Sequence, residues 1–135
     1  RLELNLEGYE YFEPDAIFAL QGKLFLLESE RRQMNNKKQL FEKIEKHLLA
    51  IQNRIPAKKF DMLGHRFLFV LNNESLMNEA IEFTRKIRRG DEFFLFKLYH
   101  ELVNEVNQEG NKFIIEPVKE YFKGWRTFSG LRDIL

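Results

Sequence analysis

Three acidic residues, Asp15, Glu28 and Glu30, lie on either side of a short turn in the first quarter of the chain. Carboxylate oxygens that converge on one point bind Mg²⁺ or Mn²⁺. A cation held in this way polarises a phosphodiester and lowers the pKa of an attacking water. The three acids support such chemistry only if the fold brings them together, so the elements that carry them decide what they do.

Residues 9–30 predict a β-hairpin that would bring two of these acids together. Short runs rich in Phe, Leu and Ile flank Gln21 and Gly22, a pair that suits a two-residue turn. With this pair at the centre of the turn, Asp15 on the first strand lies directly opposite Glu28 on the second. Opposed side chains of an antiparallel pair have Cβ atoms about 4.5–5.5 Å apart. The register therefore predicts two neighbouring carboxylates on one face of the hairpin.

Two carboxylates in this arrangement destabilise a sheet unless their charge is compensated. A divalent cation is one compensator, with Asp15 and Glu28 as its ligands and Glu30 on the same face if the strand continues. Protonation of one carboxyl group is a second, and pairing with Arg31 or Arg32 is a third. A merely solvated pair of acids also fits. A turn of three or four residues would shift the register by one and separate the two carboxylates.

Beyond the hairpin, apolar residues alternate between helical spacing and short strand-like runs. Helical spacing predicts helices at Lys37–Gln52, ended by Pro56, and at Leu76–Ile87, closed by Gly90. Short apolar runs predict strands at Arg66–Leu71, Phe93–Phe96 and Phe113–Glu116. Shorter patterns predict an edge strand at Leu2–Leu6, a helix at Leu98–Asn107 and a last helical turn at Val118–Lys123.

This order of elements predicts an α/β fold. A leading antiparallel hairpin followed by α-β-α-β gives a mixed β-sheet with helices on both faces. The 135 residues suit a single domain over 1–135. The chain begins at Arg1 rather than at a methionine, which leaves open that it is a fragment of a longer protein.

Composition excludes several classes of function. The chain has no cysteine, which rules out disulfides, thiolate chemistry and cysteine-ligated zinc and fits a reducing, cytoplasmic compartment. No apolar run approaches the roughly 18 residues of a membrane span, so we expect no membrane partner. The net charge is only +1, so a nucleic-acid-binding protein of this composition would need a local basic face.

The order and spacing of several short motifs carry a family resemblance. They read PDAIFAL from Pro14, LFLLESER from Leu24, EKIEKH from Glu42 and HRFLFVLNNE from His65, with Trp125 near the end. This pattern, over Phe12–Trp125, resembles the PD-(D/E)xK superfamily of nucleases. Within it, the chain looks most like the replication-relaxation family, which is linked to plasmid replication and mobilisation. The resemblance implies a restriction-endonuclease-like fold, DNA as substrate, and Mg²⁺ or Mn²⁺ as cofactor.

By that resemblance, Asp15 and Glu28 match the metal-binding acids of the superfamily. The lysine expected two residues after Glu28 is replaced by Glu30, and this departure puts cleavage of phosphodiesters in doubt. Lys43 forms an i, i+4 pair with His47 along one edge of the apolar stripe of the 37–52 helix. If that edge overhangs the hairpin, Lys43 supplies the missing charge. Its ordinary alternative is a lysine that covers apolar surface, and for His47 it is a boundary histidine.

Four basic residues lie beside the acids and are candidates for phosphate contacts: Arg31, Arg32, Lys37 and Lys38. A solvated basic face is the alternative. The leading interpretation is a metal-dependent endodeoxyribonuclease-like hydrolase, with Asp15, Glu28, Glu30 and Lys43 as catalytic residues. Its rival is an inactive member of the same fold that binds DNA or a replication or mobilisation protein. An α/β interaction domain without a nucleic-acid role is a third. A homodimer is left open.

Overall fold

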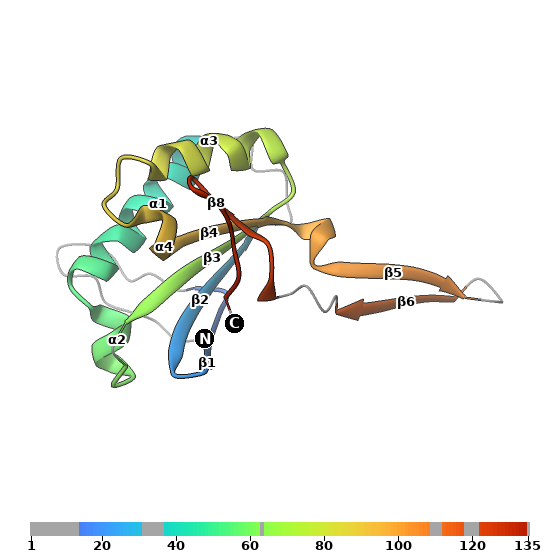
Figure 1. Cartoon of the computed structure of the whole chain (residues 1–135), viewed down its shortest axis with the longest axis horizontal. Helices are drawn as coiled ribbons and strands as arrows, with labels where there is room; N and C mark the ends of the chain where they lie inside the picture. The colour runs from blue at the N-terminus through green and yellow to red at the C-terminus, as the bar shows by residue number, and fades with distance from the viewer. Residues whose placement is uncertain (1–13, 31–36, 63, 109–111, 118–121, 135) are drawn as a thin grey trace.

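The computed structural model describes residues 14–30, 37–62, 64–108, 112–117 and 122–134 (Figure 1). The predicted α/β class is confirmed: a six-stranded mixed sheet has the strand order β1-β2-β3-β4-β7-β8, and helices pack against it. The strands of this sheet are β1 (Ala16–Leu20), β2 (Lys23–Glu30), β3 (His65–Leu71), β4 (Phe94–Leu98), β7 (Trp125–Thr127) and β8 (Gly130–Arg132). The helices are α1 (Lys37–Gln52), α2 (Ile55–Lys59), α3 (Glu74–Thr84), α4 (Gly90–Phe93) and the 3₁₀ turn η1 (Tyr99–Glu101).

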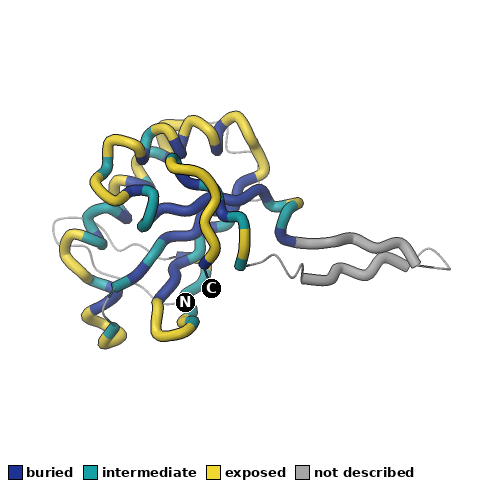
Figure 2. The backbone as a smooth tube through the Cα atoms, in the orientation of Figure 1, coloured by how far each residue is buried: buried dark blue, intermediate teal, exposed yellow. Residues whose placement is uncertain are grey.

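Strands β2, β3 and β4 run parallel at the centre of the sheet, and antiparallel strands complete it on both sides. Each parallel connection passes through helices, α1 and α2 between β2 and β3, and α3 and α4 between β3 and β4. The nearly continuous apolar sequences of β3 and β4 follow from this position, because both faces of a central parallel strand are covered. Figure 2 shows the resulting band of buried backbone.

The β1–β2 turn has the predicted conformation and register. Gln21 and Gly22 both have positive φ, at 50° and 78°, as a two-residue type I′ hairpin turn requires. This turn follows the right-handed twist of the two strands. The ladder then pairs Leu20 with Lys23 and continues to Ala16 with Leu27. The hairpin register predicted from the sequence is therefore confirmed over the whole of β1.

The two faces of the sheet carry different cores. On the first face, side chains of all four α-helices pack against alternate residues of the strands, including Leu26, Phe67 and Phe96. On the second, Phe25, Leu95 and other strand residues pack with Trp125 and with side chains from the segment after β4. In the part of the chain that the structure describes, no α-helix contributes to this second core. The prediction of helices on both faces is therefore not met by these residues.

Several elements differ from the prediction. The expected helix at Leu98–Asn107 is wrong: η1 leads directly into β5 (Val103–Gln108), which pairs with β6 (Lys112–Pro117) in a separate two-stranded sheet. This hairpin extends away from the main sheet (Figure 1). The α1 and β3 predictions are confirmed, the latter with one additional residue at its start. The Leu2–Leu6 strand and most of the predicted turn at Val118–Lys123 lie outside the described residues.

Gly90 has a different role from the predicted one. Helix α3 ends at Thr84, and Gly90 begins α4 instead of closing α3. A Cβ atom at Gly90 would lie 2.4 Å from the carbonyl oxygen of Thr84. The close approach of these two backbone segments therefore requires glycine at this position.

We expect Leu26→Ala to lower the free energy of unfolding by about 2–5 kcal/mol, because it leaves a cavity in the core between β2 and α1. Leu26 is fully buried, whereas Leu131 in β8 is 74% exposed. Leu131→Ala is therefore the matched control, with an expected change within about 0.5 kcal/mol. Urea unfolding followed by circular dichroism measures both. Equal effects of the two substitutions would contradict the packing described above.

Candidate active site around Glu28

Glu28 carries a carboxylate into the core between the sheet and α1. It lies on β2 opposite Phe69 of β3, and only 3% of the residue is exposed. It shares its face of β2 with Leu24 and Leu26, which both belong to the first core. A charged group in such a position is costly unless a nearby charge and hydrogen bonds compensate it. The neighbours of Glu28 on α1 therefore determine its state.

Lys43 supplies the compensating charge. Helix α1 buries Leu40 and Ile44 against the sheet, which places Lys43 at the edge of the apolar stripe. Its Nζ atom lies 2.8 Å from Oε2 of Glu28, and 32% of its side chain remains exposed. The condition set out from the sequence, that this helix edge overhangs the hairpin, is met by this contact. Lys43 therefore lies between the buried carboxylate and the solvent. This differs from the alternative role, in which the lysine covers apolar surface and has no acidic partner.

His47, one turn further along α1, contacts the same carboxylate. Its Nε2 atom lies 3.8 Å from Oε1 of Glu28, and its ring stacks on Phe67 with a centroid distance of 4.2 Å. Burial lowers the pKa of His47 well below its ordinary value, and the positive charge of Lys43 lowers it further. The imidazole is therefore neutral at pH 7. The prediction of a boundary histidine is wrong, because His47 is only 1% exposed.

A second buried histidine, His65, lies at the start of β3 on the same face of the sheet. Its ring meets Phe67 edge-on at 5.0 Å. Within the part of the chain that is described, neither ring nitrogen has a hydrogen-bond partner. Burial lowers the pKa of His65 to about 4, assisted by the charges of Arg66 and Arg54. The sequence interpretation began this strand one residue later, although alternation with Phe67 and Phe69 would have placed His65 on the buried face.

Asp15 contacts the residues on either side of Glu28 and does not have the predicted geometry. The regular ladder ends at Ala16, and Asp15 donates its backbone N–H to the carbonyl of Leu27 at 3.0 Å. Its Oδ2 atom accepts a hydrogen bond from the backbone N–H of Ser29 at 2.7 Å. The prediction that Asp15 and Glu28 form a regular cross-strand pair is therefore wrong. The exposed Asp15 carboxylate instead caps the backbone one residue beyond Glu28.

The other predicted site residues stand as follows. Glu30 is the last residue of β2, paired with Leu71 of β3, and its side chain lies outside what the structure describes. Arg31 and Arg32 also lie outside the described residues. Lys37 and Lys38 begin α1, and both are exposed.

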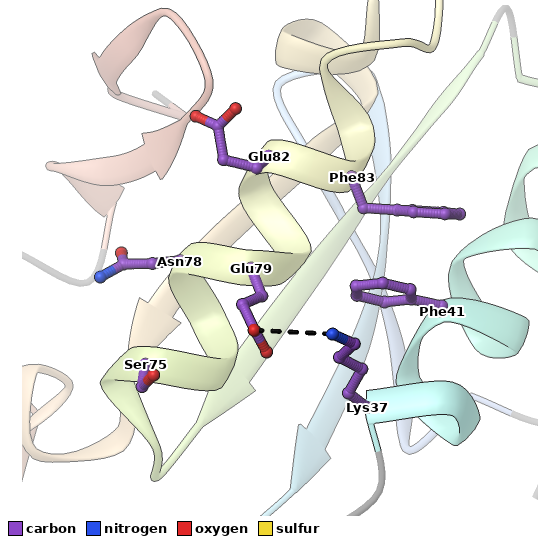
Figure 3. A pocket seen from close by; sticks show the side chains of 7 residues that line it. All are labelled: Lys37, Phe41, Ser75, Asn78, Glu79, Glu82 and Phe83. Atoms are coloured by element: carbon purple, nitrogen blue, oxygen red, sulfur yellow. Dashed lines mark ion pairs between the residues drawn. The ribbon is translucent and has the colours of Figure 1, made fainter.

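Lys37 faces an acidic neighbour. Figure 3 shows it in a groove between α1 and α3, beside the stacked rings of Phe41 and Phe83. Its Nζ atom lies 3.7 Å from Oε1 of Glu79, and both side chains are at least half exposed. Glu82 lines the same groove. A phosphate contact at Lys37 would have to replace the interaction with Glu79, so its nucleic-acid role stays a prediction.

A small, hard cation at this end of β2 would have Asp15 and Glu28 as its protein ligands. Asp15 and Glu28 offer carboxylate oxygens, and Mg²⁺ commonly takes one or two carboxylates and completes its shell with water and phosphate oxygens. Among the described side chains, no group of three or more histidines and acids is arranged to hold a metal. A cation site at Asp15 and Glu28 therefore stays a prediction, and the Glu28 carboxylate is paired with Lys43.

Comparisons with protein-family models, curated proteins and solved structures gave no match to this chain. None of the helices described here is both long and apolar enough to cross a membrane. The family resemblance therefore depends on the sequence motifs alone.

We expect Lys43→Met to lower the free energy of unfolding by about 1–3 kcal/mol, since it leaves the Glu28 carboxylate buried without its cation. The partial exposure of Lys43 keeps the loss below that of a fully buried pair. Lys37→Met is the matched control, because an exposed pair contributes less than about 1 kcal/mol. Chemical unfolding at pH 7 measures both variants.

A double variant separates the charge from the packing. Glu28→Leu combined with Lys43→Met removes both charges, so we expect it to recover most of the stability lost in the single variant. A double variant no more stable than Lys43→Met alone would show that the pair is not the cause of the loss.

The lowered pKa of His65 predicts a loss of stability in acid. Between pH 6.5 and about 4, the unfolded chain takes up a proton at this residue and the folded chain does not. The free energy of unfolding therefore falls as the pH falls through this window, by on the order of 3 kcal/mol for this histidine. His65→Gln should make the dependence shallower, with His47 contributing the remainder.

The exposed His100 in η1 provides the control for this pH dependence. Stability measured by urea unfolding at intervals from pH 4 to 7 should have the same slope in His100→Gln as in the wild type. If His65→Gln also leaves the slope of the unfolding free energy against pH unchanged, His65 is protonated equally in the folded and unfolded chains.

Proposed function

We propose that this chain is a metal-dependent nuclease-like domain that acts on DNA, of the PD-(D/E)xK type and related to plasmid replication or mobilisation. The observation that carries the proposal is the contact between Lys43 and Glu28, at 2.8 Å. In the motif that the sequence resembles, a lysine follows the acid on the same strand. Here Glu30 occupies that position, and a lysine reaches the acid from α1 instead.

The arrangement of elements supports the same proposal. The Pro14-Asp15 motif precedes β1, Glu28 lies near the end of β2, α1 follows, and β3 returns parallel to β2. The motifs therefore fall on a hairpin, a helix and a parallel strand in the expected order. A restriction-endonuclease-like topology of the sheet is part of the proposal.

Asp15 and Glu28 are the residues that would hold the cation. When bound, Mg²⁺ or Mn²⁺ would supply a Lewis acid for the phosphodiester and lower the pKa of an attacking water. The Oδ2 atom of Asp15 is oriented by the N–H of Ser29, the residue after Glu28 on β2. Oriented donors of this kind reduce the reorganisation that cation binding requires.

Lys43 has the position to act on the substrate. Its Nζ atom lies 2.8 Å from Oε2 of Glu28, and 32% of its side chain is exposed, so that a phosphate oxygen would approach it from the solvent. The buried, neutral His47 packs behind Glu28 and limits the movement of the carboxylate. Glu28 therefore positions Lys43, and Lys43 stabilises negative charge that develops on a phosphate.

The second candidate is an inactive member of the same fold that binds DNA or a replication or mobilisation protein. The burial of Glu28 favours it, because only 4% of its side chain is accessible and Lys43 already neutralises it. In this case the Glu28–Lys43 pair holds α1 on the sheet and carries out no chemistry. The two candidates differ in whether a divalent cation binds and whether DNA is cut.

Calorimetric titration of Mg²⁺ and Mn²⁺, followed by cleavage assays on supercoiled plasmid and duplex oligonucleotides, tests the proposal. We expect millimolar or tighter cation binding that Asp15→Asn abolishes. Cleavage should require the cation and fall by on the order of 100-fold or more in Asp15→Asn and Lys43→Met. Asp61→Asn is the matched control, because Asp61 is exposed and its positive φ suits asparagine.

The two candidates give different results. DNA binding without cation binding or cleavage would support the inactive member. Absence of cleavage together with equal DNA affinity in all variants would contradict a role for this site. Absence of any DNA binding at low salt would contradict the nuclease and would restrict the inactive member to binding a protein.

A further inference from the structure

A basic cavity lies on the face of the sheet opposite Glu28. Its volume is about 200 Å³, and it is lined by the cationic side chains of Lys23, Arg66 and Arg132 and by the acidic Asp133. Buried apolar side chains complete its wall, namely Phe25, Leu95 and Ile134. Three cations thus converge on one small, half-enclosed space.

Two neighbouring strands and one distant strand bring these cations together. Lys23 begins β2, and Arg66 lies on β3, paired with Phe25 of β2. Arg132 ends β8, on the far side of the sheet order. It reaches the cavity because the chain after β8 crosses the second face of the sheet and turns towards β2, where Ile134 enters the second core (Figure 1). The fold therefore gathers these charges from three separate strands.

The acids nearby do not balance this charge. Arg66 contacts Glu92 at 2.8 Å, but Arg89 contacts the same carboxylate at 2.7 Å. Oδ1 of Asp133 accepts a hydrogen bond from the backbone N–H of Gly124. Within the described part of the chain, Lys23 and Arg132 form no ion pair. The cavity is therefore left with an excess of positive charge.

The electrostatics of Arg66 indicate the same excess. Burial lowers the pKa of its guanidinium from the ordinary value, and the charges of Arg132 and Arg89 lower it further, against the opposing effect of Glu92. Like charges that a fold holds together in a half-buried cavity repel each other, so an anion placed among them is stabilised.

We propose that this cavity binds a phosphate group. Three donors that approach from different strands suit a tetrahedral anion with several oxygens, and guanidinium groups bind phosphate through paired hydrogen bonds. The cavity is smaller than the roughly 300–1,000 Å³ of sites for drug-sized ligands. It therefore takes one phosphate group rather than a whole nucleotide. The source is either a polynucleotide backbone or a free phosphate or phosphomonoester.

This site is separate from the proposed active site. Lys23 and Glu28 are five residues apart on β2, which is about 16 Å along a strand, and Phe25 and Glu28 face opposite sides of the sheet. Phosphate binding here needs no divalent cation. The inference therefore goes beyond the proposed nuclease function, and the two fail or succeed independently.

Titration of inorganic phosphate into the ¹⁵N-labelled chain, with EDTA present and ionic strength matched by chloride, tests the inference. We expect saturable shifts of amide resonances in residues 23–25 and 131–134. Arg132→Gln should weaken binding at least tenfold. Arg88→Gln is the control, because Arg88 is exposed and outside the cavity. Arg132 is also exposed, so its variant should keep the wild-type unfolding midpoint.

The outcomes are distinct. No saturable shift in the wild type, or equal weakening in both variants, would overturn the inference. If phosphate binds as expected, a short DNA duplex added in EDTA identifies the source. If the duplex abolishes the phosphate dependence of these resonances, the site binds a nucleic-acid backbone. If the phosphate-induced shifts are unchanged by the duplex, the site binds a free phosphate or phosphomonoester.

Discussion

A carboxylate that a strand carries into the core must be matched by positive charge, and Glu28 imposes this requirement on the packing of α1. Lys43 and His47 are four residues apart, so both lie on one side of the helix and both reach Glu28. Leu40 and Ile44 fill the adjacent stripe against the sheet. The rotation of α1 about its axis is thus set by polar and apolar contacts together.

The elements that form this site follow closely from the sequence. A two-residue turn at Gln21 and Gly22 leaves one register for the hairpin, and that register holds as far as Ala16. Helical spacing over 37–52 gives the bounds of α1, because this helix has one continuous apolar stripe. Spacing alone therefore places Lys43 at the edge of that stripe, whereas its position above the hairpin and its pairing with Glu28 depend on how the helix packs on the sheet.

What could not be predicted depends on contacts between distant segments. The residue before Asp15 is a buried proline, which has no N–H to donate, so the ladder does not continue past Ala16. The short side chain of Asp15 then accepts a hydrogen bond from the backbone N–H of Ser29.

Strand β5 has helix-like apolar spacing, but its pairing with β6 decides its conformation. The burial of His47 depends on Phe67, which the sequence does not place.

The balance of charge around Glu28 constrains any action on DNA. Asp15 and Glu28 bring two negative charges, Lys43 brings one positive charge, and His47 is neutral at pH 7. Taken alone, these side chains repel a phosphodiester, since the N–H that binds Asp15 is a dipole and carries no net charge. A divalent cation reverses the sign of the site, and Lys43 then adds to the attraction. With a net charge of only +1 over the whole chain, DNA cannot be held near these acids by the overall field. Binding at this end of β2 therefore depends on local cations, and a chain that binds none has to meet DNA through another surface.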